Sequence, residues 1–147
     1  NKYGMGTSIN RASSTTDLCH RGRSFDIPGE VVDGMDVRAV RDAAEVALEH
    51  ARSGKGPYIL EMLTYRYRGH SMSDPAKYRT KEEVEKMRSE HDPIEQVRRR
   101  ILDAKWASED ELKAIDREAR DIVNEAAEFS QSDPEPDPSE LWTDIAR

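Results

Sequence analysis

The central part of the chain carries two apolar runs separated by an amphipathic stretch. Val31-Val32 follows a Pro-Gly turn signal and predicts a short strand, and 58–64 has the length and apolar character of a buried strand. Between them, apolar residues recur at helical spacing over 37–53, after the N-cap residue Asp36 and before Gly54. Strand, helix and strand in this order predict a right-handed parallel crossover unit.

Three further helices are predicted from their start signals. Thr80 and Ser108 are each followed three residues later by a glutamate, which is the capping-box pattern. Asp92 precedes a proline at the first helical position, which predicts another helix between the helix that starts after Thr80 and the one that starts after Ser108. The third helix should run to about Phe129. It has one apolar face, formed by Leu112, Ile115, Ala119, Ile122, Val123 and Ala126.

The two ends of the chain have weaker patterns. Residues 1–30 are rich in Gly, Ser, Thr, Asn and Arg, and they predict a loop with a short helix over 9–17. Near the other end, 133–138 alternates acidic residues with prolines and predicts an extended linker. Ser139 follows this linker and predicts the cap of a last short helix through Ile145.

These elements predict an α/β fold class followed by several helices. Residues 1–80 are interpreted as an incomplete α/β core that contains an irregular loop over 65–80, and 81–147 as a helical region that contains the acidic linker. The chain opens on Asn1 in a glycine-punctuated turn, which predicts a piece of a longer protein. Because two parallel strands leave open edges and apolar faces, we expect such a piece to self-associate, swap elements or stay bound to the rest of its protein.

Charge narrows the classes of function. The chain has 23 basic and 30 acidic residues, so its net charge of −7 argues against a nucleic-acid binder. Residues 105–147 are acidic, whereas 65–104 are mildly basic and either meet phosphate or carboxylate groups or form a solvated surface. The single cysteine, Cys19, favours a reducing compartment. No apolar run is long enough to cross a membrane, and no secretory signal is visible.

The first candidate for chemistry is the segment 1–8, Asn-Lys-Tyr-Gly-Met-Gly-Thr-Ser. A side-chain amide oxygen and a backbone carbonyl two residues apart can both reach one Mg²⁺ ion, which takes about six oxygens. Gly4 and Gly6 would let the backbone approach a ligand closely. By spacing alone this pattern is weak, and a plain turn is the favoured interpretation of the segment.

The second candidate is the loop 65–80, which follows the predicted second strand. Ligands bind at the carboxyl ends of strands in open α/β sheets. Histidine changes charge near neutral pH, arginines hold phosphate through paired hydrogen bonds, and a serine among cations can accept a phosphoryl group. A polar surface loop is the alternative. The residues of interest are Arg66, Arg68, His70, Ser71, Ser73 and Arg79.

Both segments resemble the alpha subunits of pyruvate dehydrogenases, which are thiamine-diphosphate-dependent decarboxylases. The resemblance rests on segment 1–8 and on Tyr-Arg-Tyr-Arg-Gly-His-Ser-Met-Ser-Asp-Pro at 65–75, and it extends over essentially the whole chain. It implies the carboxyl-terminal part of a thiamine-diphosphate-binding fold, with parallel strands and a crossover helix. The implied enzyme decarboxylates pyruvate and passes the acetyl unit to a lipoyl group of dihydrolipoyl acetyltransferase, together with a beta subunit.

The resemblance also implies roles for particular residues. Asn1 would give a side-chain oxygen to Mg²⁺ and Tyr3 a backbone carbonyl, so that both help to bind thiamine diphosphate. His70 would be the catalytic residue at the mouth of the active site, near the cofactor diphosphate and the incoming lipoyl group. Ser71 and Ser8 match phosphorylation positions of the mitochondrial enzymes.

The sequence departs from the family in two respects. Lys77 replaces a second loop serine of the mitochondrial relatives, which favours a bacterial, cytoplasmic enzyme over one of the mitochondrial matrix. The Gly-Asp-Gly motif whose aspartate binds Mg²⁺ is absent, so we expect this chain alone to be inactive and to bind no cofactor. The alternatives are a non-catalytic protein-interaction module, or the alpha subunit of a branched-chain 2-oxo acid or acetoin dehydrogenase.

Overall fold

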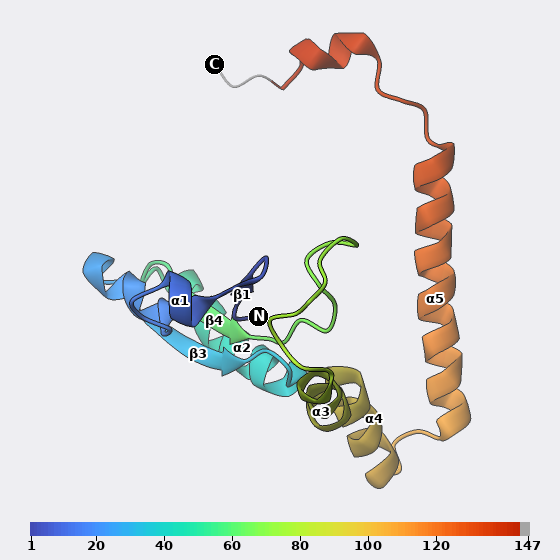
Figure 1. Ribbon diagram of the computed structural model, residues 1–147, viewed down its shortest axis with the longest axis horizontal. Helices are drawn as coiled ribbons and strands as arrows, with labels where there is room; N and C mark the ends of the chain where they lie inside the picture. The colour runs from blue at the N-terminus through green and yellow to red at the C-terminus, as the bar shows by residue number, and fades with distance from the viewer. Residues whose placement is uncertain (145–147) are drawn as a thin grey trace. The chain divides into compact units, whose positions relative to one another are not determined.

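The computed structural model describes residues 1–144 of the chain. It is a mixed helix and strand structure with a small parallel sheet and several helices (Figure 1). The chain divides into two compact units, Asn1–Arg100 and Ile101–Arg147. No helix in the described part of the chain combines the length and the apolar character needed to cross a membrane.

The sheet of the first unit consists of β3 (Gly29–Asp33) and β4 (Ile59–Leu63). The strands are parallel, and their register runs from Gly29 opposite Ile59 to Asp33 opposite Leu63. Helix α2 (Val37–Arg52) connects them and buries Ala43. Its N-cap is Asp36, whose carboxylate accepts from the backbone N–H of Arg38. The predicted strand–helix–strand unit is therefore confirmed.

The chain leaves β3 through a tight passage at Gly34. The backbone N–H of Gly34 donates to the Leu63 carbonyl at 2.8 Å. A Cβ atom at this position would lie 2.7 Å from the Thr64 methyl and 2.9 Å from that carbonyl. Since the second of these neighbours is backbone, it cannot move aside cheaply, and only glycine lets the two strand ends lie this close together.

A 3-10 helix, η1 (Leu18–Phe25), contacts both strands and was not predicted. It brings Cys19 into the core, where only 2% of the residue is exposed. The backbone N–H of Cys19 donates to a carboxylate oxygen of Glu61 at 2.7 Å. Burial, and then the Glu61 charge, raises the pKa of the Cys19 thiol. The thiol is therefore a neutral core group.

The amino-terminal segment forms more structure than predicted. Strands β1 (Tyr3–Gly4) and β2 (Thr7–Ser8) pair antiparallel, and α1 covers only Ile9–Ala12. The predicted helix over 9–17 is thus too long. Beyond Ala12, the side-chain oxygens of Ser13 and Thr15 accept from backbone N–H groups two residues ahead, which competes with helical hydrogen bonding.

Helices α3 (Lys81–His91) and α4 (Pro93–Asp103) follow the loop, and both start where predicted. Thr80 caps α3, and Asp92 caps α4 by accepting from two backbone N–H groups. The capping box predicted at Thr80 is only half formed. The carboxylate of Glu83 accepts from the Tyr65 hydroxyl at 2.9 Å, because the preceding loop brings that phenol to the start of the helix.

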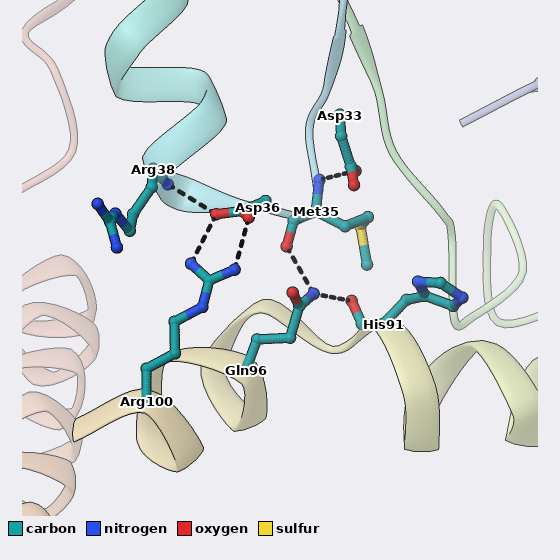
Figure 2. Close-up of polar contacts among 7 residues, drawn as sticks. All are labelled: Asp33, Met35, Asp36, Arg38, His91, Gln96 and Arg100. Carbon is teal, nitrogen blue, oxygen red and sulfur yellow. Dashed lines mark hydrogen bonds and ion pairs between the residues drawn. The ribbon is translucent and has the colours of Figure 1, made fainter. Parts of the chain in front are cut away.

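A cluster of polar contacts joins α4 to the turn between β3 and α2 (Figure 2). The Arg100 guanidinium donates to both carboxylate oxygens of Asp36, at 2.7 and 3.1 Å. The Gln96 amide donates to the Met35 carbonyl at 3.1 Å and to the His91 carbonyl at 3.2 Å. The bonds from Arg100, followed by the bond from the Arg38 N–H, lower the pKa of Asp36 to about 2.

The second unit contains the long helix α5 (Glu109–Ser132) and the 3-10 helix η2 (Pro138–Trp142). Ser108 and Glu111 form the predicted capping box. Helix α5 ends three residues later than predicted, at Ser132. The cap of η2 is Asp137 and not Ser139, since the Asp137 carboxylate accepts from the Ser139 N–H at 2.8 Å. Ile145, the predicted end of the last helix, lies outside the described residues.

Replacing Asp36 should destabilise the first unit through two separate losses. Asp36→Ala removes both the helix cap and the ion pair, and should lower the free energy of unfolding by about 1–2 kcal/mol. Asp36→Asn keeps a capping side chain and should cost less. Urea unfolding followed by circular dichroism measures this. Arg41→Ala is the control, because its exposed pair with Glu45 should contribute little. An equal effect of Asp36→Ala and Arg41→Ala would contradict the assignment.

The ion pair between Asp36 and Arg100 should make the free energy of unfolding depend on pH. The folded-state pKa of Asp36, about 2, lies below its ordinary value of 3.8. A lowered carboxylate pKa stabilises the fold above the ordinary value, and this stabilisation is lost as the pH falls through about 2. The urea midpoints of wild type and Asp36→Asn should therefore differ more at about pH 6 than at about pH 2.5. If the two urea midpoints differ equally at both pH values, the charge of the Asp36 carboxylate does not contribute to stability.

Candidate functional site

The segment 1–8 forms a tight hairpin with one residue before its first strand and one in its turn in the left-handed region. Lys2 has φ 63° and Met5 has φ 51°. The Asn1 side-chain oxygen accepts from the Tyr3 backbone N–H at 3.0 Å, and the Lys2 carbonyl accepts from the Ile9 N–H at 2.9 Å. The segment is therefore a hairpin in which the Asn1 side-chain oxygen accepts from Tyr3 and the Tyr3 carbonyl accepts from Arg66.

The loop 65–80 is organised around one carboxylate that the sequence analysis did not single out. Asp74 accepts from the backbone N–H groups of His70 at 2.7 Å and Ala76 at 2.8 Å, and from the Tyr78 hydroxyl at 3.0 Å. The bond from the His70 N–H is the largest cause that lowers the pKa of Asp74. Asp74 is therefore the charged centre of the loop.

The hairpin and the loop are in direct contact, although 60 or more residues separate their bonding partners. The Arg66 guanidinium donates to the Met5 carbonyl at 3.2 Å and to the Tyr3 carbonyl at 3.3 Å. The rings of Tyr3 and Tyr78 lie 4.8 Å apart. Since Tyr78 also bonds to Asp74, a continuous set of contacts runs from the hairpin to the backbone of His70.

Arg79 is held between aromatic rings at the end of the loop. Its guanidinium lies 5.2 Å from the Tyr65 ring centroid and 5.6 Å from that of Tyr78. Two of its nitrogens, Nε and Nη1, are buried and have no hydrogen-bond partner among residues 1–144, and the two ring faces supply attractive contacts to the guanidinium. Burial, and then the bond to Glu83, raises the pKa of Tyr65, which stays a neutral donor.

The other predicted site residues lie at the surface or in local caps. His70 is exposed, and within the described residues its imidazole makes no hydrogen bond. Ser71 is exposed, and its hydroxyl lies 3.0 Å from that of Ser73. Ser8 caps α1 by accepting from the Asn10 N–H at 3.3 Å.

A cavity of about 300 Å³ lies where the carboxyl ends of β3 and β4 meet the hairpin and α3. This is the edge of the sheet at which the sequence predicted a ligand. Two acidic side chains, Asp33 and Glu83, line it. No group of three His, Cys, Asp or Glu residues in the described part of the chain could hold a metal ion. The lining residues are Asn1, Lys2, Tyr3, Asp33, Met35, Leu63, Thr64, Tyr65, Glu83, Met87 and His91.

The chain is similar in sequence to a known family of dehydrogenase components. A family model described as "Dehydrogenase E1 component" matches residues 1–139, and the chain belongs to this family. Among curated proteins, the chain is 72% identical over 145 residues to the pyruvate dehydrogenase E1 component subunit alpha of Rhizobium meliloti (strain 1021). That match covers 99% of the chain and 42% of the relative.

More distant relatives have the same name. The subunit of Zymomonas mobilis is 52% identical over 145 residues, which cover 99% of the chain and 41% of that protein. The mitochondrial subunit of Sminthopsis macroura is 52% identical over 142 residues, which cover 96% of the chain and 39% of that protein. The chain thus spans about two-fifths of the length of these relatives.

The backbone contacts of Asp74 had a partial sequence signal. Asp74 precedes a proline, and aspartates in such turns commonly bind backbone N–H groups two residues on. The contact of Tyr78 with Tyr3 and the bonds of Arg66 to the hairpin had none, because nothing local indicates that residues so far apart in sequence will meet.

Replacing Asp74 should loosen the loop without unfolding the unit. Asp74→Ala removes three acceptor contacts, so tryptic cleavage after Arg68 and Lys77 should become about tenfold faster. Asp42→Ala is a matched control on α2, since within the described residues that carboxylate accepts no hydrogen bond. Equal cleavage rates in the two variants would contradict the role of Asp74.

Proposed function

We propose that the chain is part of the alpha subunit of a pyruvate dehydrogenase E1 component. The parent enzyme decarboxylates pyruvate with thiamine diphosphate and reductively acetylates lipoyl groups of dihydrolipoyl acetyltransferase. The observation that supports this proposal most directly is the contact of Arg66 with the Tyr3 and Met5 carbonyls. This contact brings the hairpin of residues 1–8 to the loop that contains His70. The 72% identity to the Rhizobium meliloti subunit supports it.

The hairpin has the chemistry that a magnesium diphosphate needs. The Asn1 amide oxygen and the Tyr3 carbonyl are hard oxygens, and each accepts one hydrogen bond and keeps a second lone pair. A Cβ atom on Gly4 would meet nothing within 4 Å, so the backbone there is open to a ligand. Arg66, on the Tyr3 carbonyl, could pair with phosphate oxygens. These residues would supply part of the ligand set, and the remainder of the parent subunit would supply the rest.

When bound, thiamine diphosphate supplies the electron sink for decarboxylation. The residues of this chain would position that group. Asn1 and Tyr3 would hold the metal ion, and His70 would stand at the mouth of the site, where an exposed imidazole can donate a hydrogen bond or move a proton at the lipoyl group. The fold of the complete subunit would be the thiamine-diphosphate-binding α/β fold, with 1–80 in its core.

Two serines of the chain are proposed modification positions. A phosphate on Ser71 would meet Ser73, whose hydroxyl lies 3.0 Å away, and would add negative charge to the loop that Asp74 organises. A phosphate on Ser8 would remove the acceptor that caps α1. Modification of either position would therefore disturb the contact between the hairpin and the loop.

The proposed partners are the beta subunit, the lipoyl domain of dihydrolipoyl acetyltransferase and pyruvate. A cytoplasmic bacterial location is favoured over the mitochondrial matrix, since Lys77 replaces the loop serine of the mitochondrial relatives. A non-catalytic interaction module is not supported. The same holds for a branched-chain 2-oxo acid or acetoin dehydrogenase, because the relatives above are all named for pyruvate.

Calorimetry and turnover together test the function. The 147-residue chain titrated with Mg²⁺ and thiamine diphosphate should give no heat of specific binding. The complete subunit assembled with its beta subunit should bind both and release carbon dioxide from pyruvate faster than from branched-chain 2-oxo acids. Micromolar cofactor binding by the short chain would contradict the first expectation. A preference for branched-chain substrates would overturn the assignment to pyruvate.

The metal role of Asn1 can be tested in the same complete enzyme. Asn1→Ala removes one oxygen ligand and should raise the Mg²⁺ concentration needed for half-saturation at least about tenfold. Asn10→Ala is the matched control, because this asparagine lies on α1 and is exposed. If both variants bind Mg²⁺ like the wild type, Asn1 is not a ligand.

A further inference from the structure

One face of α5 carries an apolar seam with the spacing of a coiled coil. Its members are separated alternately by three and four residues, which places them at the a and d positions of successive heptads. The seam extends along about 26 Å of the helix. Its residues are Leu112, Ile115, Ala119, Ile122, Ala126 and Phe129. This pattern is narrower and more regular than a general amphipathic face.

Almost the whole seam is exposed. Leu112 is half-buried, whereas Ile115, Ile122 and Phe129 are 60%, 59% and 67% exposed. Val123, beside the seam, is 66% exposed. A helix of this length gains most of its stability from packing of its apolar face, and exposed apolar stripes of this size mark interaction sites.

The seam is bordered by acid on one side. Glu111, Glu118 and Glu125 recur every seven residues at the g positions. The Glu111 carboxylate is engaged at the helix cap by Ser108. Glu118 and Glu125 make no ion pair with any residue that the structure describes, so their charges are available to a partner.

The opposite border of the seam is nearly neutral. Asp116, at an e position, is paired with Arg120 at 3.0 Å, and the next two e positions are Val123 and Ser130. The negative charge that faces a partner therefore lies on one side only, at Glu118 and Glu125.

This charge pattern argues against a second copy of the chain as the occupant. In a parallel pair of α5 helices, g faces e of the other copy, so Glu118 would face Val123 and Glu125 would face Ser130, with no attractive pair. In an antiparallel pair the glutamate rows would face each other and repel. Alanine at 119 and 126 leaves room for large side chains from the opposite helix.

We propose that α5 is a docking face for a basic amphipathic helix of another protein chain. That helix would place large apolar residues against Ala119 and Ala126, and Lys or Arg beside Glu118 and Glu125. Packing along the seam would supply most of the affinity, and the two glutamates would select the partner. The proposal does not depend on the proposed function, because it uses no residue of the site.

The test uses the 147-residue chain and two designed helical peptides. Both peptides have leucine at a and d; one carries lysine at e and g, and the other carries glutamate there. The lysine peptide should bind about tenfold or more tightly than the glutamate peptide by fluorescence anisotropy, and more weakly as salt is added. The double variant Glu118→Lys, Glu125→Lys should reverse this preference.

Two controls keep the result interpretable. Glu128→Lys makes one such charge reversal at a c position, away from the seam, and should keep the wild-type preference. Ile122→Asp should abolish binding of both peptides, and circular dichroism would show that each variant keeps its helix. Because the charge reversals lie on exposed residues, they test the seam without removing any core contact.

Three results would overturn the proposal. Equal binding of the two peptides would mean that the glutamates select nothing. A dimer in sedimentation equilibrium that Ile122→Asp dissolves would identify a second copy as the occupant. If neither peptide binds although the helix is intact, the seam is not available to an external helix and is covered by other parts of the protein.

Discussion

The parallel pairing of β3 with β4 is the contact on which the first unit depends. Parallel strands need a crossover, which α2 provides, and they bring their carboxyl ends to the same edge of the sheet. The glycine after β3 lets the backbones meet closely at that edge. The hairpin residues Asn1 and Tyr3, which are proposed to bind a ligand, line the cavity at this edge of the sheet. The candidate site is therefore a consequence of strand direction as much as of any single side chain.

A small core makes polar contacts important in this unit. The buried apolar residues within the described part of the chain are Cys19, Val32, Met35 and Ala43. With so little buried apolar surface, helices α3 and α4 are held largely by directed bonds. Carboxylates recur as the acceptors: Asp36 for Arg100, Asp92 for Tyr67 at 3.1 Å, and Glu83 for Tyr65. Such bonds fix orientation well, because each requires a particular geometry.

The exposed apolar residues of the two units differ in their surroundings. On α2, Val37, Val46 and Leu48 are about half exposed, on a helix that flanks a parallel sheet. Sheets of this kind are normally covered on both faces by further layers of the same protein. On α5 the apolar residues form a heptad seam with acid on one side. The first pattern suits completion of an α/β domain, and the second suits recognition of a basic helix.

Local signals in the sequence determined the elements whose hydrogen bonds are local. The caps at Asp36, Thr80, Asp92 and Ser108 follow from side chains that bond to nearby backbone N–H groups. The helix of the crossover unit and the seam of α5 follow from the spacing of apolar residues. The motifs of both loops likewise determined the family, which the comparisons confirmed.

Tertiary structure alone decided which distant segments meet. Arg66 reaches carbonyls 61 and 63 residues away, and Cys19 bonds to a carboxylate 42 residues on. The helix η1, which contacts both strands, also depended on contacts between distant segments. The hydrogen bond of a helix cap joins neighbouring residues, so it forms without any tertiary contact. A contact between distant residues forms only after the strands have paired and closed the intervening loop. No local pattern records that closure.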